Sequence, residues 1–167
     1  MSARSERVVE THSGAETEAL GAEVAGELRP GDVVLIEGEL GSGKTTFVRG
    51  AARALGIEGP VASPTFTIGQ VLRGDRAVVA HLDLYRLSSL EAEDPSLLDD
   101  YLGPDRVTFV EWPAIGRARL PPHRLRVRLS HLGGDMRRVE LLQPGEIEGP
   151  RESDGPGETD GPGPGSA

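Results

Sequence analysis

A glycine-rich segment at residues 38–45 is the sequence feature that most constrains what this chain can fold into. It reads GELGSGKT and matches the phosphate-binding pattern G-x-x-x-x-G-K-S/T at every fixed position. The apolar run VVLI at residues 33–36 precedes it, and a sequence compatible with a helix follows. The pattern therefore predicts a turn between a buried strand and a helix, with backbone N–H groups directed at phosphate oxygens.

Two side chains of this segment have specific expected roles. Lys44 is placed to reach the β- and γ-phosphates of a nucleotide, and the Thr45 hydroxyl is placed to ligate Mg²⁺. Lys44 is also the only lysine in the chain, whereas arginine occurs seventeen times. A guanidinium is a planar fork, but a phosphate cradle needs a compact ammonium that donates in three directions. The single lysine therefore favours a nucleotide site over an incidental glycine-rich turn.

Length and composition indicate one folded domain followed by a tail. The chain has 167 residues, and we expect a single domain with a proper core over residues 1–143. Residues 144–167 are rich in Gly, Pro and acidic residues, so we expect them to be disordered. Because much of the negative charge lies there, the overall acidity does not exclude a partner that carries nucleic acid. A docking or autoinhibitory role for the tail stays open beside that of a solvated extension.

The composition also excludes several classes of protein. The chain has no cysteine, so disulfides and thiolate metal sites are ruled out. Its first residues, MSARSER, lack the apolar core of a signal peptide, and no apolar run has the length needed to span a membrane. We therefore expect a cytoplasmic protein that does not associate with membranes.

The pattern of apolar residues predicts several strands. The mostly apolar segments at residues 33–37 and 107–110 are typical of strands covered on both faces, and a shorter candidate lies at residues 7–10. Two pairs of β-rich runs around Gly-containing turns indicate hairpins at residues 68–84 and 124–142. Strands that are first interleaved with helices and later paired in hairpins predict a sheet that is parallel near residues 38–45, called the phosphate loop below, and antiparallel toward its edges.

Helical patterns occur in three segments. Ser13 and Glu16 have the spacing of a capping box at the start of the first helix. A second helix is expected at residues 46–55, and a third within residues 91–102, where an Asp-Pro dipeptide would start it. With the strands, these helices predict a three-layer α/β fold of the P-loop NTPase type, with a mixed sheet of about seven strands.

Two acidic residues stand at the ends of apolar strands. Asp83 follows a run that includes His81, and Glu111 follows the strand at residues 107–110. Ligands of open α/β sheets bind beyond the carboxyl ends of the strands, so both acids are well placed to act on a nucleotide. Each could instead be an ordinary surface acid at a strand exit. No His-rich metal spacing accompanies His81, which makes zinc improbable.

Three further features allow more than one interpretation. The hydroxyl-rich segment 63–67 is either a switch that responds to a γ-phosphate or a turn satisfied by local hydrogen bonds. Trp112 either packs in the core or stacks on a nucleotide or partner. Arg124, Arg126 and Arg128 alternate along one strand, where they form either a charged sheet edge or a contact for RNA phosphate or an acidic partner.

Four motifs in order, GSGKTT at 41–46, SPTFT at 63–67, HLDLYR at 81–86 and EWP at 111–113, resemble those of the bacterial TsaE family. The resemblance implies a small P-loop ATPase of tRNA threonylcarbamoyladenosine biosynthesis. It implies that ATP hydrolysis supports the TsaD and TsaB proteins, which modify the adenosine beside the anticodon in tRNAs reading codons that begin with A. Contact with tRNA is expected through that complex, and direct contact is left open.

The resemblance also implies roles for individual residues, with ATP and Mg²⁺ as cofactors. Lys44 and Asp83 would serve hydrolysis, and Thr45 and Glu111 would hold the metal. The nucleotide would be bound by Thr11, Gly14, Gly41, Ser42, Gly43, Lys44, Thr45 and Thr46, with the segment from Thr11 to Gly14 near the base. Ala114 and the acidic tail depart from the commoner family pattern.

The same phosphate-binding segment is compatible with functions other than ATP hydrolysis. A small-molecule or nucleotide kinase is the main alternative, although residues 88–104 offer little room for an acceptor-binding insert. A GTP switch with the N-K-x-D motif is excluded, because the chain has no asparagine and its one lysine lies in the phosphate loop. A module that binds ATP without hydrolysing it also stays open.

Overall fold

The computed structural model describes residues 7–64, 66–87 and 93–145. Almost all of the predicted tail lies outside the described residues, so its disorder stays a prediction. The elements in chain order are β1 (Arg7–Thr11), α1 (Gly14–Ala25), β2 (Val33–Glu37), α2 (Lys44–Ala54), β3 (Gly69–Arg73), β4 (Val78–Asp83), β5 (Arg106–Glu111), the 3-10 helix η1 (Pro113–Arg119), β6 (Leu125–Gly133) and β7 (Met136–Leu142).

All seven strands form one mixed sheet in the order β1-β7-β6-β2-β5-β4-β3. The four central strands run parallel, because β2 pairs in parallel with β5 and β6, and β4 pairs in parallel with β5. The outer strands β1, β7 and β3 pair antiparallel. The predicted α/β fold and its mixed sheet are confirmed. Parallel pairing places the carboxyl ends of β2, β5 and β4 at one edge.

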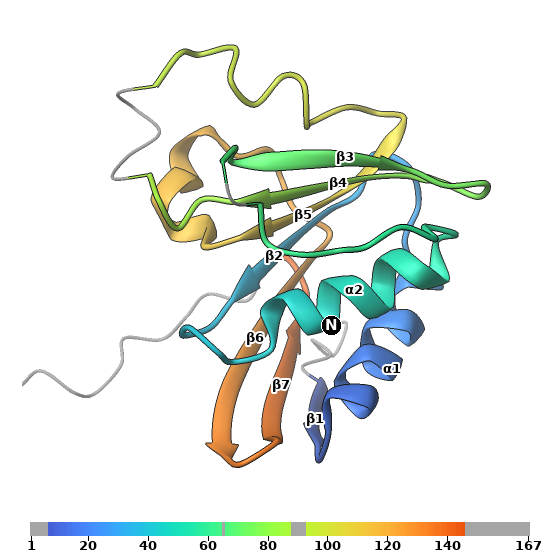
Figure 1. Ribbon diagram of the computed structural model, residues 1–167. Helices are drawn as coiled ribbons and strands as arrows, with labels where there is room; N and C mark the ends of the chain where they lie inside the picture. Colours follow the sequence, from blue (N-terminus) through green and yellow to red (C-terminus); the bar gives the residue numbers. More distant parts are fainter. Residues whose placement is uncertain (1–6, 65, 88–92, 146–167) are drawn as a thin grey trace, which may run out of the picture.

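Helices α1 and α2 lie side by side on one face of the sheet (Figure 1). Their apolar side chains and those of the strands beneath them form the larger core cluster, in which Phe47 and Phe109 are fully buried. The two helices approach each other closely at glycines. A Cβ at Gly21 would collide with the carbonyl oxygen of Phe47, and a Cβ at Gly50 with that of Glu18. This contact fixes α2, and with it the end of the phosphate loop.

The opposite face of β2, β4 and β5 is covered by turns and by η1, which enclose a second core cluster containing Leu35, Leu82 and Leu98. The helix predicted within residues 91–102 is wrong for the described part, which consists of turns. The Asp94 carboxylate accepts hydrogen bonds from Ser96 N and Ser96 Oγ, at 2.8 and 2.7 Å. Such local bonds stabilise a turn in competition with a helix, and residues 88–92 lie outside the description.

The start of α1 differs in one detail from the predicted capping box. The Ser13 Oγ accepts a hydrogen bond from Glu16 N at 3.1 Å, as expected. The Glu16 carboxylate reaches back to His12 N at 2.7 Å instead of Ser13 N. The helix ends at Ala25. Among the described residues, no helix has the length and apolar character needed to cross a membrane.

The close packing of α1 on α2 predicts the effect of Gly50→Ala. The added methyl group would overlap the Glu18 backbone, and overpacking should outweigh the gain in helix propensity. We expect the free energy of unfolding to fall by on the order of 2 kcal/mol. Urea unfolding checks this, with Gly59→Ala as the control, because a Cβ at Gly59 meets nothing within 4 Å. Equal stability of the two variants would contradict the packing account.

Candidate nucleotide site

The phosphate loop connects the end of β2 to the first residue of α2, as the sequence predicts. Gly38, Gly41 and Gly43 have φ angles of 152°, 74° and 97°, which side chains rarely tolerate. Gly43 is the N-cap of α2 and offers no side chain to cap the helix. The first N–H groups of α2 have no partner inside the helix and are available to an anion.

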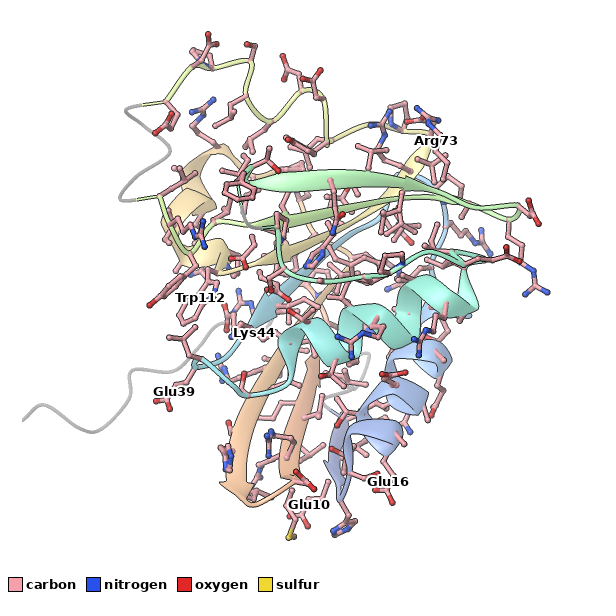
Figure 2. All side chains as sticks on the ribbon, in the orientation of Figure 1. Glu10, Glu16, Glu39, Lys44, Arg73 and Trp112 are labelled. Carbon is pink, nitrogen blue, oxygen red and sulfur yellow. The ribbon has the colours of Figure 1, made fainter. Side chains whose placement is uncertain are left out.

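The Lys44 side chain lies folded against this loop. Its Nζ donates hydrogen bonds to the carbonyl oxygens of Gly38 and Glu39, at 2.8 and 2.7 Å. It also lies 4.4 Å from the centroid of the Trp112 ring, and Figure 2 shows Lys44 and Trp112 next to each other. Burial lowers the pKa of Lys44, while the charge of Glu111 opposes that shift. The ammonium is thus held by carbonyls that phosphate oxygens can replace.

Two carboxylates, at the ends of the neighbouring strands β4 and β5, line the same cavity as Lys44. Asp83 and Glu111 are register partners at the ends of β4 and β5. The Thr45 hydroxyl donates to Glu111 Oε1 at 2.9 Å and lies 2.8 Å from the Ser63 Oγ. The structure therefore brings together Lys44, Thr45, Asp83 and Glu111, all of which the sequence predicts to be functional.

These oxygen atoms suit a Mg²⁺ ion that is shared with a nucleotide. Mg²⁺ prefers oxygen ligands and is commonly held by one or two protein groups together with phosphates and water. Thr45 and Glu111 supply a hydroxyl and a carboxylate at one point. Across the described part of the chain, no group of three or more His, Cys, Asp or Glu could hold a metal ion. The donor set fits a nucleotide-bound cation better than a metal held by protein groups alone.

The surroundings of the Asp83 carboxylate raise its pKa above the ordinary value of aspartate. Burial raises its pKa, and the neighbouring charge of Glu111 raises it further. The hydrogen bond from Tyr85 N, at 3.1 Å, and the nearby His81 oppose the shift. A carboxylate that accepts a proton readily beside a phosphate loop is suited to orienting a water molecule.

His81 lies behind the two acids and is fully buried. Its Nε2 is 3.4 Å from Glu111 Oε1, and neither ring nitrogen forms a hydrogen bond within the described residues. The imidazole therefore packs against the carboxylate that contacts Thr45. Tyr85 lies two residues beyond the end of β4 and is half exposed.

Trp112 forms one wall of the site. It is the one non-glycine residue in the described ranges with a positive φ, at 57°. Its ring lies 4.9 Å from that of Tyr85, and part of the side chain packs against the second core cluster. Trp112 therefore packs partly in the core, as one of the two alternatives predicts, and its ring faces the Lys44 ammonium. Stacking of Trp112 on a nucleotide or a partner stays a prediction.

Other predicted residues are placed less decisively. Ser63 of the proposed switch segment contacts Thr45, but Thr65 lies outside the described residues. Thr11 is buried, and its hydroxyl lies 2.7 Å from that of Thr17. A Cβ on Gly14 would lie 3.9 Å from Thr46. A role for Thr11 and Gly14 near the nucleotide base, and one for Thr46 in binding the nucleotide, stay predictions.

The arginine stripe does not form a sheet edge, because β6 lies between β2 and β7. Arg126 and Arg128 instead approach Glu37, with nitrogen to oxygen distances of 3.7 and 3.4 Å. Arg117 reaches the same carboxylate at 3.5 Å. The interpretation of these arginines as a charged sheet edge is therefore wrong. The local pattern of β6 does not reveal its parallel pairing with β2.

The site opens into a cavity of about 280 Å³. It is lined by residues of the loop, the strand ends and β7, namely Leu40, Gly41, Gly43, Lys44, Thr45, Thr46, Ser63, Asp83, Tyr85, Glu111, Trp112 and Arg137. Sequence reasoning missed Arg137. Its neighbour Arg138 is also an arginine. The two differ only in the face of β7 on which they lie, because side chains alternate along a strand and Arg137 lies on the face toward the helices.

Comparison with known proteins assigns the chain to a family. The family model described as threonylcarbamoyl adenosine biosynthesis protein TsaE matches residues 11–139. The chain belongs to the TsaE family. The matched residues include the whole phosphate loop and both strand-end acids.

Individual TsaE relatives agree with this assignment. The tRNA threonylcarbamoyladenosine biosynthesis protein TsaE of Bacillus subtilis is 39% identical over 130 residues, covering 78% of this chain and 81% of the relative. That of Streptomyces coelicolor is 43% identical over 118 residues, covering 70% of this chain and 80% of the relative. The crystal structure of YdiB from Bacillus subtilis matches with a TM-score of 0.70 and 32% identity, covering 86% of this chain and 88% of that one.

The raised pKa of Asp83 predicts that Asp83→Asn stabilises the protein at neutral pH. Because this pKa is higher in the folded than in the unfolded chain, the folded state binds more protons between the two values and loses stability as the pH rises through them. The substitution removes that loss, so we expect the melting temperature at pH 7 to rise by on the order of a few degrees.

The gain should shrink as the pH falls to the ordinary pKa of aspartate. Thermal unfolding at pH 7 and near pH 4 measures it, with Asp75→Asn in the exposed turn between β3 and β4 as the control. A melting temperature of Asp83→Asn no higher than that of the wild type at pH 7 would show that burial of this charge is not costly.

Proposed function

We propose that this chain is an ATPase required to form the threonylcarbamoyl group on the adenosine adjacent to the anticodon, in tRNAs reading codons that begin with A. It would act in the cytoplasm with the TsaD and TsaB proteins and reach tRNA through that complex. The observation that carries the proposal is the convergence of Lys44, Thr45, Asp83 and Glu111 in one cavity of a TsaE-family chain.

The residues of the site divide the work of hydrolysis. The N–H groups at the start of α2 and the Lys44 ammonium would bind the β- and γ-phosphates. Thr45 and Glu111 would hold the magnesium ion, which when bound neutralises charge that develops on the phosphates. Asp83 would orient the attacking water and take up its proton, for which its raised pKa is suited.

Binding would require two local exchanges of partners. Lys44 would give up the Gly38 and Glu39 carbonyls for phosphate oxygens. The Thr45 hydroxyl would give up Glu111, so that both oxygens face the cation. Because each exchange breaks an existing hydrogen bond, we propose that the chain alone hydrolyses ATP slowly and that the partner complex accelerates it.

Hydrolysis of ATP by the wild type and by Lys44→Ala, each with and without cognate TsaD, TsaB and tRNA, tests the proposal. We expect the wild-type rate to rise with the partners, and Lys44→Ala to lose about a hundredfold or more. Lys44→Arg should fail as well, because a planar fork cannot replace the compact ammonium. A wild-type rate that ignores the partners would contradict the assignment, and phosphorylation of an added acceptor would indicate a kinase.

The two carboxylates should differ in what their removal affects. Asp83→Ala is expected to keep the affinity for ATP and lose turnover, because its side chain would act on water. Glu111→Ala is expected to weaken the Mg²⁺-dependent part of ATP binding. Calorimetric titration with and without Mg²⁺, together with single-turnover hydrolysis, separates these effects. Equal losses of ATP affinity in both variants would reject this division of roles.

A further inference from the structure

Arg137 lies where three parts of the fold meet. On β7 it is the register partner of Thr11 on β1. It shares the helix-facing side of β7 with Val139 and Leu141, which belong to the core cluster beneath α1 and α2. Its side chain lines the same cavity as Lys44. A cation on an antiparallel outer strand therefore reaches the phosphate loop, which follows a parallel central strand.

The Arg137 guanidinium connects the hairpin to the loop. Its Nη1 donates to the carbonyl oxygens of Gly134 and Met136, at 2.8 and 2.9 Å. Its Nη2 donates to the carbonyl oxygen of Gly41 at 3.1 Å. None of these acceptors is charged, and Arg137 forms no ion pair with a carboxylate in the part of the chain that is described. Within the described residues, its positive charge therefore lies beside the loop without a carboxylate partner.

The peptide group between Gly41 and Ser42 in the phosphate loop is held at both ends. Arg137 binds one end, and another residue of the loop binds the other end. The carbonyl of Gly41 accepts from Arg137, while the N–H of the same peptide, on Ser42, donates to the Glu39 carbonyl at 3.1 Å. The C=O and N–H of a trans peptide point in opposite directions. Because both ends are engaged, the plane between Gly41 and Ser42 cannot turn without breaking a hydrogen bond.

The orientation of this peptide affects the donors that follow it. Gly43 comes two residues after Gly41 and caps α2, whose free N–H groups face the phosphate site. A Cβ on Gly43 would lie 3.8 Å from Arg137 Nε, so the guanidinium also packs along this part of the loop. Glycines place little restriction on the backbone, and an external contact can select one of the conformations available to them.

We propose that Arg137 is a positioning residue that holds the phosphate loop in the form that binds a polyphosphate. It acts through the Gly41 carbonyl, whereas Lys44 is the residue placed to touch phosphate. The inference rests on the proposed nucleotide site, but it assigns to the β6–β7 hairpin a part in forming that site. The ligand feature it concerns is the polyphosphate chain, and neither the ribose nor the base.

The test compares Arg137→Met with Arg138→Met. Methionine keeps much of the aliphatic length and removes every donor, and Arg138 is an exposed neighbour on β7. Dissociation constants are measured by calorimetry, in the presence of Mg²⁺, for ATP and for inorganic tripolyphosphate, which has neither ribose nor base. We expect Arg137→Met to weaken both ligands by about tenfold, the order expected for losing a hydrogen bond from a charged group. Arg138→Met should stay within about twofold of the wild type for both ligands.

Steady-state hydrolysis gives a second readout that a purely structural role would not change. Arg137→Met should raise KM for ATP by a similar factor and leave kcat within about twofold, because the catalytic groups are intact once the loop is occupied. If Arg137→Met fails to fold, Arg137→Lys replaces it. This variant keeps the charge but not the fork, and a loss of about threefold for both ligands is expected.

The possible results separate this inference from the function on which it rests. If the wild type and Arg138→Met bind both ligands and Arg137→Met binds them equally well, the inference alone is wrong. If Arg137→Met weakens ATP but not tripolyphosphate, Arg137 contacts the nucleoside and the positioning role is rejected. If the wild type binds neither ligand, the proposed nucleotide site fails, and the inference fails with it.

Discussion

The burial of one ammonium group beside two carboxylates is the interaction on which the site depends. Lys44 is 6% exposed, and a charge in that position is stable only if it is well solvated by the protein. Two loop carbonyls and the face of Trp112 provide that solvation. Asp83 and Glu111 favour the charged form from across the cavity. We propose that a polyanion with its cation enters this site by exchanging these partners.

The fold supplies this arrangement through the order of its strands. Because β2, β5 and β4 are parallel neighbours, the phosphate loop and the two acids leave the sheet at the same edge. The glycine contact between α1 and α2 fixes the helix whose first turn faces the site. Outer strands contribute as well, since β7 brings Arg137 to the loop. The site is therefore a property of the whole sheet and not of the loop alone.

Features set by local chemistry could be predicted from the sequence, whereas features set by long-range pairing could not. The loop glycines, Lys44 and the strand-end positions of Asp83 and Glu111 follow from short patterns. The turns at residues 93–101 depend on a competition between the Asp94 side chain and a helix. The neighbours of β6 and the reach of Arg137 depend on which strands pair across the sheet. No local pattern contains that information.

The central claim is that the phosphate loop of this chain serves tRNA modification. The most direct measurement is the amount of threonylcarbamoyladenosine in tRNA from a bacterium depleted of its own TsaE and supplied with either the wild-type chain or Lys44→Ala, at matched protein levels. The account predicts that the wild type restores the modified nucleoside and that Lys44→Ala does not. Restoration by both proteins, or by neither, would contradict it.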